Sequence, residues 1–175
     1  MRAVIRFLVT ALLIVVVSVV IAIVYVKSTG LRGQPEPGRL ETRIADAIRG
    51  FAIPREMKER TNPLEPSKET LSKGMDHFAR YCAMCHANDG SGKKTPIGSG
   101  LYPKPPDLRD TQDLTDGEIF YIIENGVRFT GMPAFGTGQD DPEGTRQVWQ
   151  LVHFIRHLPE ITKDEIAHME SRNPL

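Results

Sequence analysis

The sequence contains little cysteine and has no excess of charge of either sign. Only two of its 175 residues are cysteine, at positions 82 and 85, and no second C-x-x-C pair accompanies them. A cysteine-rich zinc site takes about four nitrogen or sulfur ligands, so this pair cannot form one alone. Basic and acidic residues number 22 each, and this balance gives no indication of nucleic-acid binding.

Patterns typical of β-strands and internal repeats are also missing, whereas apolar residues recur at helical spacing. The sequence therefore predicts an all-α chain. Ser67 is a suitable N-cap, Thr115 and Glu118 form a capping box, and Gly126 and Pro159 are stop signals. A Gly- and Pro-rich loop is expected between two of the helices, and a loop of this length is usual only where it has a function. The expected helices are residues 39–51, 67–82, 116–125 and 142–158, and the loop is residues 87–114.

The longest apolar run lies at the N-terminus. Residues 7–26 contain only two mildly polar side chains, and about 20 apolar residues are enough to cross a hydrocarbon core as a helix. Arg2 and Arg6 precede the run, which favours a cytoplasmic N-terminus with the rest of the chain outside. A cleaved signal peptide is the alternative, but its apolar region is normally shorter, and residues 24–27 offer no small-x-small cleavage site. We expect an uncleaved transmembrane anchor.

The two cysteines belong to the sequence C-A-M-C-H at residues 82–86. C-x-x-C-H is the motif that carries covalently attached c-type haem. Two thiols about one helical turn apart can each form a thioether to a vinyl group of the haem, and the next residue directs an imidazole at the iron. We predict that Cys82 and Cys85 attach one haem c and that His86 is an axial iron ligand.

Two other readings of this motif are weaker. A Cys2His2 zinc site would have to recruit His153 and His157, and a thioredoxin-like dithiol would need a βαβ context. Haem attachment to C-x-x-C-H takes place outside the bacterial cytoplasmic membrane, as far as c-type cytochromes are a guide. Motif and anchor therefore agree on a single-pass protein of the bacterial cytoplasmic membrane, with its haem domain on the oxidising, periplasmic side.

Met132 is the best candidate for the second axial ligand. It lies between Gly131 and Pro133, where the glycine allows close approach of the backbone and the proline stiffens the turn. A core methionine is the alternative, although a Gly- and Pro-rich loop between two helices is a poor place for one. The other methionines and histidines are less suitably placed; among them, Met57 and Met169 are expected outside the core.

These patterns divide the chain into four parts: an anchor over residues 1–27, a proline-rich connector over 28–66, a helical domain over 67–159 and a loosely packed polar tail over 160–175. As a flexible coil, the connector of about 39 residues would span roughly 35 Å, enough to let a tethered domain swing between two partners. Its expected helix, residues 39–51, has apolar residues at helical spacing. That helix has three candidate roles: packing on the haem domain, resting on the lipid surface, or docking on a partner subunit.

The segment from Ser67 to Pro159 resembles a class I cytochrome c domain. Gly74 and Phe78 stand where this family crosses its first and last helices, and Leu151 and Phe154 are the matching partners on the last helix. Residues 106–108 resemble the Pro-x-Leu that follows the attachment motif in the family, and residues 131–133 resemble its methionine loop.

The resemblance implies an all-α fold of three to five helices around a covalently bound haem, preceded here by a transmembrane helix. It also implies that the Pro106 carbonyl accepts a hydrogen bond from Nδ1 of His86, and that Leu108 packs near the haem. Such a bond fixes the imidazole and raises its basicity.

With His86 and Met132 as ligands the iron has no open position, which favours electron transfer over oxygen binding, and the thioether raises the reduction potential. The first hypothesis is a membrane-anchored carrier, not itself an enzyme, that moves single electrons between respiratory or other membrane redox complexes. The alternative is a fixed cytochrome subunit of a larger oxidoreductase complex, and a haem-based sensor is a weaker third. The expected partners are membrane lipid and redox proteins. Lys93, Lys94 and Lys104 are either a basic rim for an acidic partner or solvated loop lysines.

Overall fold

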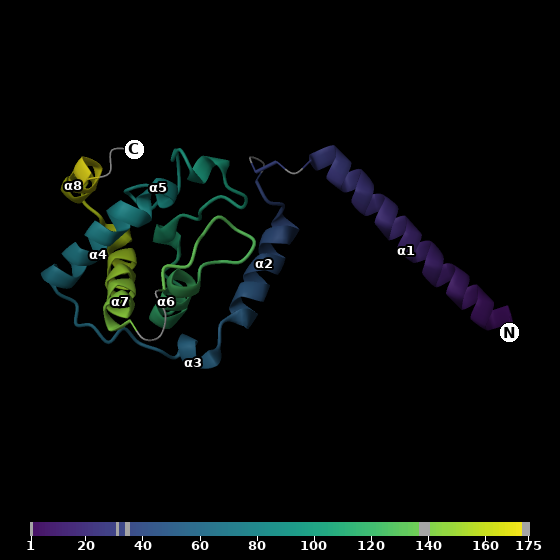
Figure 1. The fold of residues 1–175 in the computed structure, drawn as a ribbon, viewed down its shortest axis with the longest axis horizontal. Coiled ribbons are helices and arrows are strands. Elements are labelled where there is room, and N and C mark those ends of the chain that lie inside the picture. The colour runs from purple at the N-terminus through teal and green to yellow at the C-terminus, as the bar shows by residue number, and fades with distance from the viewer. Residues whose placement is uncertain (1, 31, 34–35, 137–140, 173–175) are drawn as a thin grey trace. The chain divides into compact units, whose positions relative to one another are not determined.

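The computed structural model describes residues 2–30, 32–33, 36–136 and 141–172, and it separates the chain into two compact units, Met1–Gly33 and Gln34–Leu175. Figure 1 shows helices joined by loops, and no strand occurs in the described residues. The predicted all-α class is therefore confirmed.

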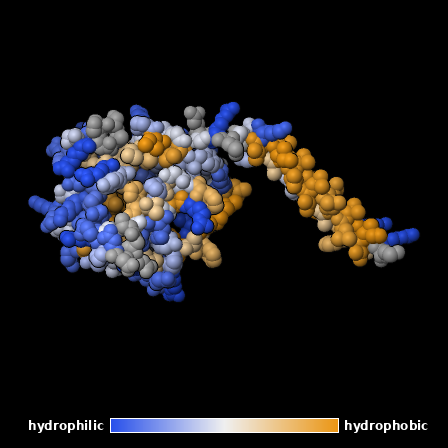
Figure 2. Space-filling model, viewed as in Figure 1, coloured by the Kyte–Doolittle hydropathy of each residue, from blue (hydrophilic) through white to orange (hydrophobic). Residues whose placement is uncertain are grey.

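The first unit consists of helix α1, Arg2–Thr29. Residues Arg2–Ser28 are long and apolar enough to cross a membrane, although a signal sequence near the N-terminus would have the same properties. Their exposed apolar side chains cover α1 in Figure 2. An apolar helix was predicted over residues 7–26. The observed helix α1 begins five residues before this run and ends three residues after it.

The second unit contains seven further helices and three short 3₁₀ turns in its described residues. The helices are α2 Arg39–Ala52, α3 Arg55–Lys58, α4 Lys68–Tyr81, α5 Ala83–His86, α6 Asp116–Asn125, α7 Pro142–His157 and α8 Lys163–Arg172, and the turns are Gly98–Gly100, Leu108–Asp110 and Leu158–Glu160. The four helices expected from the sequence are present within about one residue of their predicted ends.

The predicted start signals act as expected. The Ser67 hydroxyl accepts a hydrogen bond from the Thr70 amide at 3.0 Å and caps α4. At the start of α6, the Thr115 side chain accepts from the Glu118 amide, and the Glu118 carboxylate accepts from the Thr115 amide. Both caps satisfy backbone donors that the first helical turn leaves without partners.

The core is organised by the crossing of α4 and α7. Gly74 on α4 lies so close to α7 that an added Cβ would overlap the Gln150 carbonyl oxygen and reach within 3.0 Å of Cβ of Phe154. One turn further along α4, the ring of Phe78 packs 5.0 Å from the ring of Phe154, and both side chains are fully buried. Gly74, Phe78 and Phe154 thus have the packing that the resemblance implied.

The segment after α2 also belongs to the packed core, which corrects the expectation of a flexible connector. Ile53 is buried, and Met57 lies against α6, where an added Cβ at Gly117 would overlap its carbonyl oxygen. Asn62 Nδ2 donates to the Trp149 carbonyl at 2.9 Å, and His153 Nε2 lies 2.8 Å from the Leu64 carbonyl. These contacts join residues 53–64 to α6 and α7. The expectation that Met57 lies outside the core is therefore wrong.

The expectation of a loosely packed tail is likewise wrong. Residues 163–172 form α8, which packs on α4. Met169 is fully buried, contrary to its predicted place outside the core, and Arg172 pairs with Asp76 of α4 at 3.0 Å. The polar composition of this segment gave no indication that Met169 would be buried.

The α4–α7 crossing yields a stability prediction. Gly74→Ala should lower the free energy of unfolding by about 3 kcal/mol, the upper end of the usual cost of overpacking, because the new methyl meets backbone atoms. Gly50→Ala in α2 is the matched control: no atom lies within 4 Å of its added Cβ, so it should raise stability by about 0.5–1 kcal/mol through helix propensity. Denaturant unfolding of the detergent-solubilised chain measures both, and equal effects of the two variants would contradict the close crossing.

Candidate functional site

One cavity of about 390 Å³ collects all six residues predicted for the site. Its walls come from α4, α5, α6, α7 and two loops, residues 87–115 and 126–136, and Arg49 of α2 also lines it. The six residues are Cys82, Cys85, His86, Pro106, Leu108 and Met132. Segments up to 50 residues apart in the sequence (82 to 132) therefore meet at one place.

The turn that follows α4 presents the two thiols and the imidazole. Residues Ala83–His86 form α5, and the amides of Cys85 and His86 donate to the Cys82 carbonyl at 3.0 and 2.9 Å. A single helical turn therefore separates Cys82 from Cys85, and His86 follows directly. The chain leaves the turn at Ala87, whose φ of 61° is in the left-handed region.

Both thiols are free, and both resist ionisation. Burial, with a smaller effect of the neighbouring Cys85, raises the pKa of Cys82 to about 12. Burial also raises the pKa of Cys85. A thioredoxin-like dithiol depends on a lowered thiol pKa, so this environment argues against that reading of the motif.

His86 is partly buried, and its Nδ1 atom is fully buried. Burial lowers its pKa, and the nearby Pro106 carbonyl offsets part of this effect. Nδ1 of His86 makes no hydrogen bond of good geometry with the described residues. The implied Pro106 contact is therefore present as an electrostatic interaction but is not a well-formed hydrogen bond here.

The loop after the motif folds back onto the attachment turn. The Gly92 amide donates to the His86 carbonyl at 2.8 Å, and the Thr95 hydroxyl donates to the Cys85 carbonyl at 3.2 Å. The Leu108 amide donates to the Gly90 carbonyl at 2.9 Å. These bonds hold the Pro106–Leu108 segment beside the thiols and the imidazole.

The Met132 loop is also fixed by its own backbone. Gly126 ends α6 with a φ of 64°, and the Val127 amide donates to the Met132 carbonyl at 3.2 Å. The Met132 amide donates to the Thr130 hydroxyl at 3.1 Å. The loop returns to α6, where the Phe135 amide donates to the Ile123 carbonyl at 3.0 Å. Met132 is therefore half-buried in a tight turn at the cavity wall.

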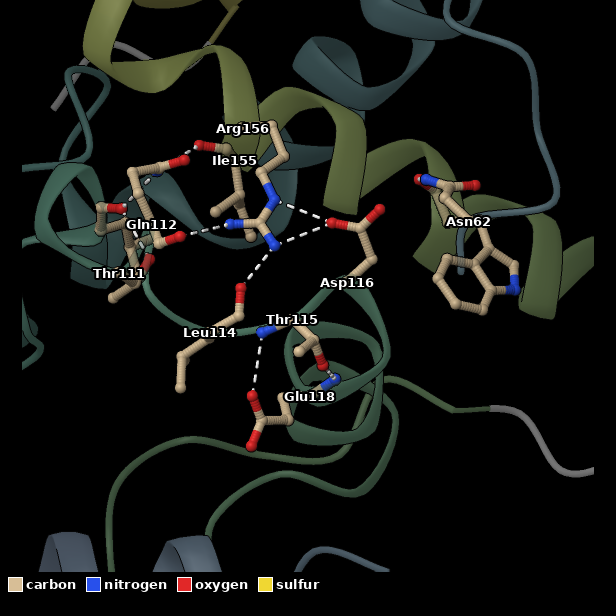
Figure 3. A network of polar contacts seen from close by, with 11 residues as sticks. Asn62, Thr111, Gln112, Leu114, Thr115, Asp116, Glu118, Ile155 and Arg156 are labelled. Carbon is tan, nitrogen blue, oxygen red and sulfur yellow. Dashed lines mark hydrogen bonds and ion pairs between the residues drawn. The ribbon is translucent and has the colours of Figure 1, made fainter. Parts of the chain in front are cut away.

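A polar network around Arg156 holds the segment before α6 on α7 (Figure 3). Arg156 Nε donates to the Asp116 carboxylate at 2.8 Å, and its terminal nitrogens donate to the carbonyls of Gln112 and Leu114. Thr111 and Leu114, from the same segment, line the cavity. Sequence reasoning missed Arg156, because no local pattern distinguishes an arginine on the last turns of a helix that binds a distant loop.

The lining fits a haem. Almost all of it is apolar, and among the described residues only Arg49 of α2, Lys104 and His86 bring ionisable nitrogens. Two thiols, an imidazole with an unpartnered buried Nδ1 and a thioether share one apolar cavity, which is the donor set that a covalently attached, six-coordinate haem requires. Lys104 was a candidate for a basic rim near the haem edge, whereas Arg49 was not predicted here, since it belongs to no recognisable motif.

Four other candidates from the sequence do not line this cavity: His153, His157, Lys93 and Lys94. His153 contacts the Leu64 carbonyl, and His157 lies 3.0 Å from Glu165. Groups of three or more His, Cys, Asp or Glu side chains able to hold a metal ion are absent from the described ranges, so the alternative zinc site is not assembled there. Lys93 and Lys94 border a separate depression, whereas Lys104 pairs with Glu36 at 2.6 Å. The three lysines therefore do not form one basic rim.

Comparison with known families agrees with this geometry. Residues 69–155 match the family described as cytochrome c oxidase, cbb3-type, subunit III. No curated protein matches the chain. The matched residues run from α4 to α7 and include all six residues predicted for the site, whereas α1, α2, α3 and α8 lie outside the match.

The Met132 turn should depend on Gly126. Gly126→Ala forces a side chain into the left-handed region and places its Cβ 2.6 Å from the Ala134 nitrogen, so we expect a loss of stability of about 1–3 kcal/mol. Amide hydrogen exchange at Val127 and Met132 should accelerate. Gly100→Ala, where nothing lies within 4 Å, is the control and should leave both amides unchanged. Unchanged exchange in the Gly126 variant would show that the turn does not require glycine.

Proposed function

The chain carries a class I cytochrome c domain over residues 69–155, and on this premise we propose that it is a membrane-anchored monohaem c-type cytochrome. It transfers single electrons between respiratory or other membrane redox complexes, with its haem domain on the periplasmic side. Electron transfer follows from the family, whereas the anchor, the single covalent haem and the compartment are parts of the proposal.

One observation supports the proposal above all others: Cys82, Cys85, His86 and Met132 line the same apolar cavity. In the proposal, the thiols of Cys82 and Cys85 would hold the haem covalently, and the His86 imidazole and the Met132 sulfur would bind its iron. When bound, the haem supplies an iron that changes oxidation state by one electron. With both His86 and Met132 as ligands, the iron would have no open position for an exogenous ligand, and electron exchange would be the available chemistry.

The surrounding residues keep this arrangement stable. Pro106 places its carbonyl beside His86, and Leu108 adds apolar lining. The apolar walls from α6 and α7 exclude water, which lowers the local dielectric and raises the cost of the oxidised, more positive iron. The methionine ligand and the low-polarity lining thus act in the same direction, toward a high reduction potential.

A fixed subunit of a larger oxidase is the second candidate, and two observations favour it. The matching family is described as an oxidase subunit. In addition, residues 53–64 pack on the core, and α2 is helical, so only the nine residues 30–38 lie between α1 and α2. Even fully extended, these residues reach at most about 30 Å. The domain has less freedom to swing than a flexible 39-residue connector would give it.

The role of Met132 can be tested directly. Met132→Ala should remove the proposed thioether ligand, lower the reduction potential and allow the reduced protein to bind carbon monoxide. Met84→Ala is the matched control, because Met84 also lines the cavity but lies inside the attachment turn. Visible spectra with and without carbon monoxide, together with redox titration, measure the change. A Met132 variant with the wild-type spectrum would mean that another residue is the ligand.

Mild detergent extraction separates the carrier from the subunit. The proposal predicts that the haem-stained chain elutes alone at the size of one chain plus its micelle. The alternative predicts stoichiometric co-elution with further subunits. An unrelated membrane protein followed in the same extract controls for incomplete solubilisation. A complex that survives a second purification step would contradict the carrier hypothesis and support the subunit hypothesis.

A further inference from the structure

We propose that α2 lies flat on the phospholipid surface of the membrane, with Leu40, Ile44, Ile48 and Phe51 inserted below the headgroups. This inference rests on the proposed anchor, since it needs α1 in the bilayer. It goes beyond the proposed function because it assigns a binding surface to a helix outside the cytochrome c match.

The apolar face of α2 is left largely exposed by the described residues. Leu40 is 72% exposed, Ile44 51%, Ile48 61% and Phe51 92%. Their spacing of four, four and three residues places them on one side of the helix. Of the three expected roles for the helix, packing on the haem domain would bury this face, so the apolar face does not serve that role among the described residues. None of the four residues lines the haem cavity, so the cofactor would not cover them either.

Apolar side chains gather on the side of the second unit where α2 runs (compare Figures 1 and 2). Four large apolar residues at such exposures within twelve residues are unusual on a soluble surface and indicate a surface that is covered in use. A strongly amphipathic helix with low overall hydrophobicity is typical of a segment that lies in the membrane interface.

The charges beside this face fit phospholipid. Arg39 and Arg43 stand four residues apart along one border of the apolar face, and no ion pair involves either of them within the described ranges. The acidic groups of α2 have other partners, since Glu41 accepts a hydrogen bond from Tyr102 and Asp46 pairs with Arg49. Two arginines with apolar stems can extend along the face and bind lipid phosphates.

Chain length favours lipid over a protein partner. The nine residues 30–38 keep the start of α2 within about 30 Å of the end of α1, so a membrane holding α1 is always within reach of this face. A protein partner would have to compete with that constant proximity. The composition of the apolar face also suits lipid. Its four side chains are Leu, Ile or Phe, and the Trp and Tyr that are enriched in protein hot spots are missing from it.

Lipid contact would also orient the haem domain. Through other residues α2 is joined to the domain: the Tyr102 hydroxyl donates to Glu41 at 2.7 Å, and Lys58 donates to the Gly50 carbonyl. Arg49 of α2 also lines the haem cavity. An α2 bound to the bilayer would therefore hold one wall of the cavity close to the membrane surface, where a membrane redox partner would meet it.

Spin labels on the full-length, haem-loaded chain in vesicles of phosphatidylcholine and phosphatidylglycerol test the proposal. Ile48→Cys reports the apolar face, Thr42→Cys is the matched control on the opposite face of the same helix, and Ile14→Cys reports the anchor. Oxygen collects in lipid and a nickel chelate stays in water. The ratio of oxygen to nickel collision rates should be several-fold higher at position 48 than at position 42, and highest at position 14.

The outcomes distinguish a failure of the proposed lipid contact of α2 from a failure of the proposed membrane anchor. A label at position 48 that is as accessible to nickel as the label at position 42, while position 14 is protected, overturns the lipid contact of α2 and leaves a protein partner for this face. Nickel access at position 14 overturns the anchor, and with it the proposed function. Because Ile48 is 61% exposed, its substitution should not disturb folding, and an unchanged haem spectrum in each variant verifies this.

Discussion

The close contact of α4 and α7 at Gly74 is the constraint from which the rest of the second unit follows. Because the two backbones meet there, Phe78 and Phe154 interlock one turn further on, and the end of α4 is fixed against α7. The attachment turn is the direct continuation of α4, and Leu151 and Ile155 of α7 line the cavity. One backbone contact thus sets the distance between the residues that would hold the haem and the wall that would cover it.

The remaining walls of the cavity are irregular segments, and backbone hydrogen bonds give them their shape. Gly92 and Thr95 bind the carbonyls of His86 and Cys85, so the long loop is positioned by the attachment turn itself. Arg156 fixes the end of the same loop on α7. Such loops need few apolar contacts of their own, since they are bonded to helices whose packing is already determined. A segment without regular structure can therefore present Pro106 and Leu108 at a defined place.

Local signals in the sequence were enough to predict the helices, their caps and the residues that gather at the cavity. Ser67, Thr115 and Glu118 act within one helical turn, so neighbouring residues determine their effect. The motif of residues 82–86 is also local, whereas Met132 was found through the glycine and proline beside it. The errors concern packing between distant segments: Met169 is buried in α8, which packs on α4, and Asn62 donates a hydrogen bond to a carbonyl of α7. Neither contact leaves a periodic signal in the sequence around these residues.

The packing of residues 53–64, in the second half of the expected connector, restricts how α2 in the first half can move. Once residues 53–64 are part of the packed core, α2 is attached to that core at one end, and nine residues connect it to α1 at the other. A helix in this position has little freedom, yet it keeps an apolar face that the protein leaves uncovered. A simple spacer would not retain four large apolar side chains on one face, because each exposed apolar surface costs free energy in water. With the proposed lipid contact of α2, the connector would orient the haem domain and would not act as a tether that lets it diffuse. Orientation also reconciles the two candidate functions, since a carrier held at a fixed angle to the membrane surface and a subunit within a complex present the same cavity wall to a partner.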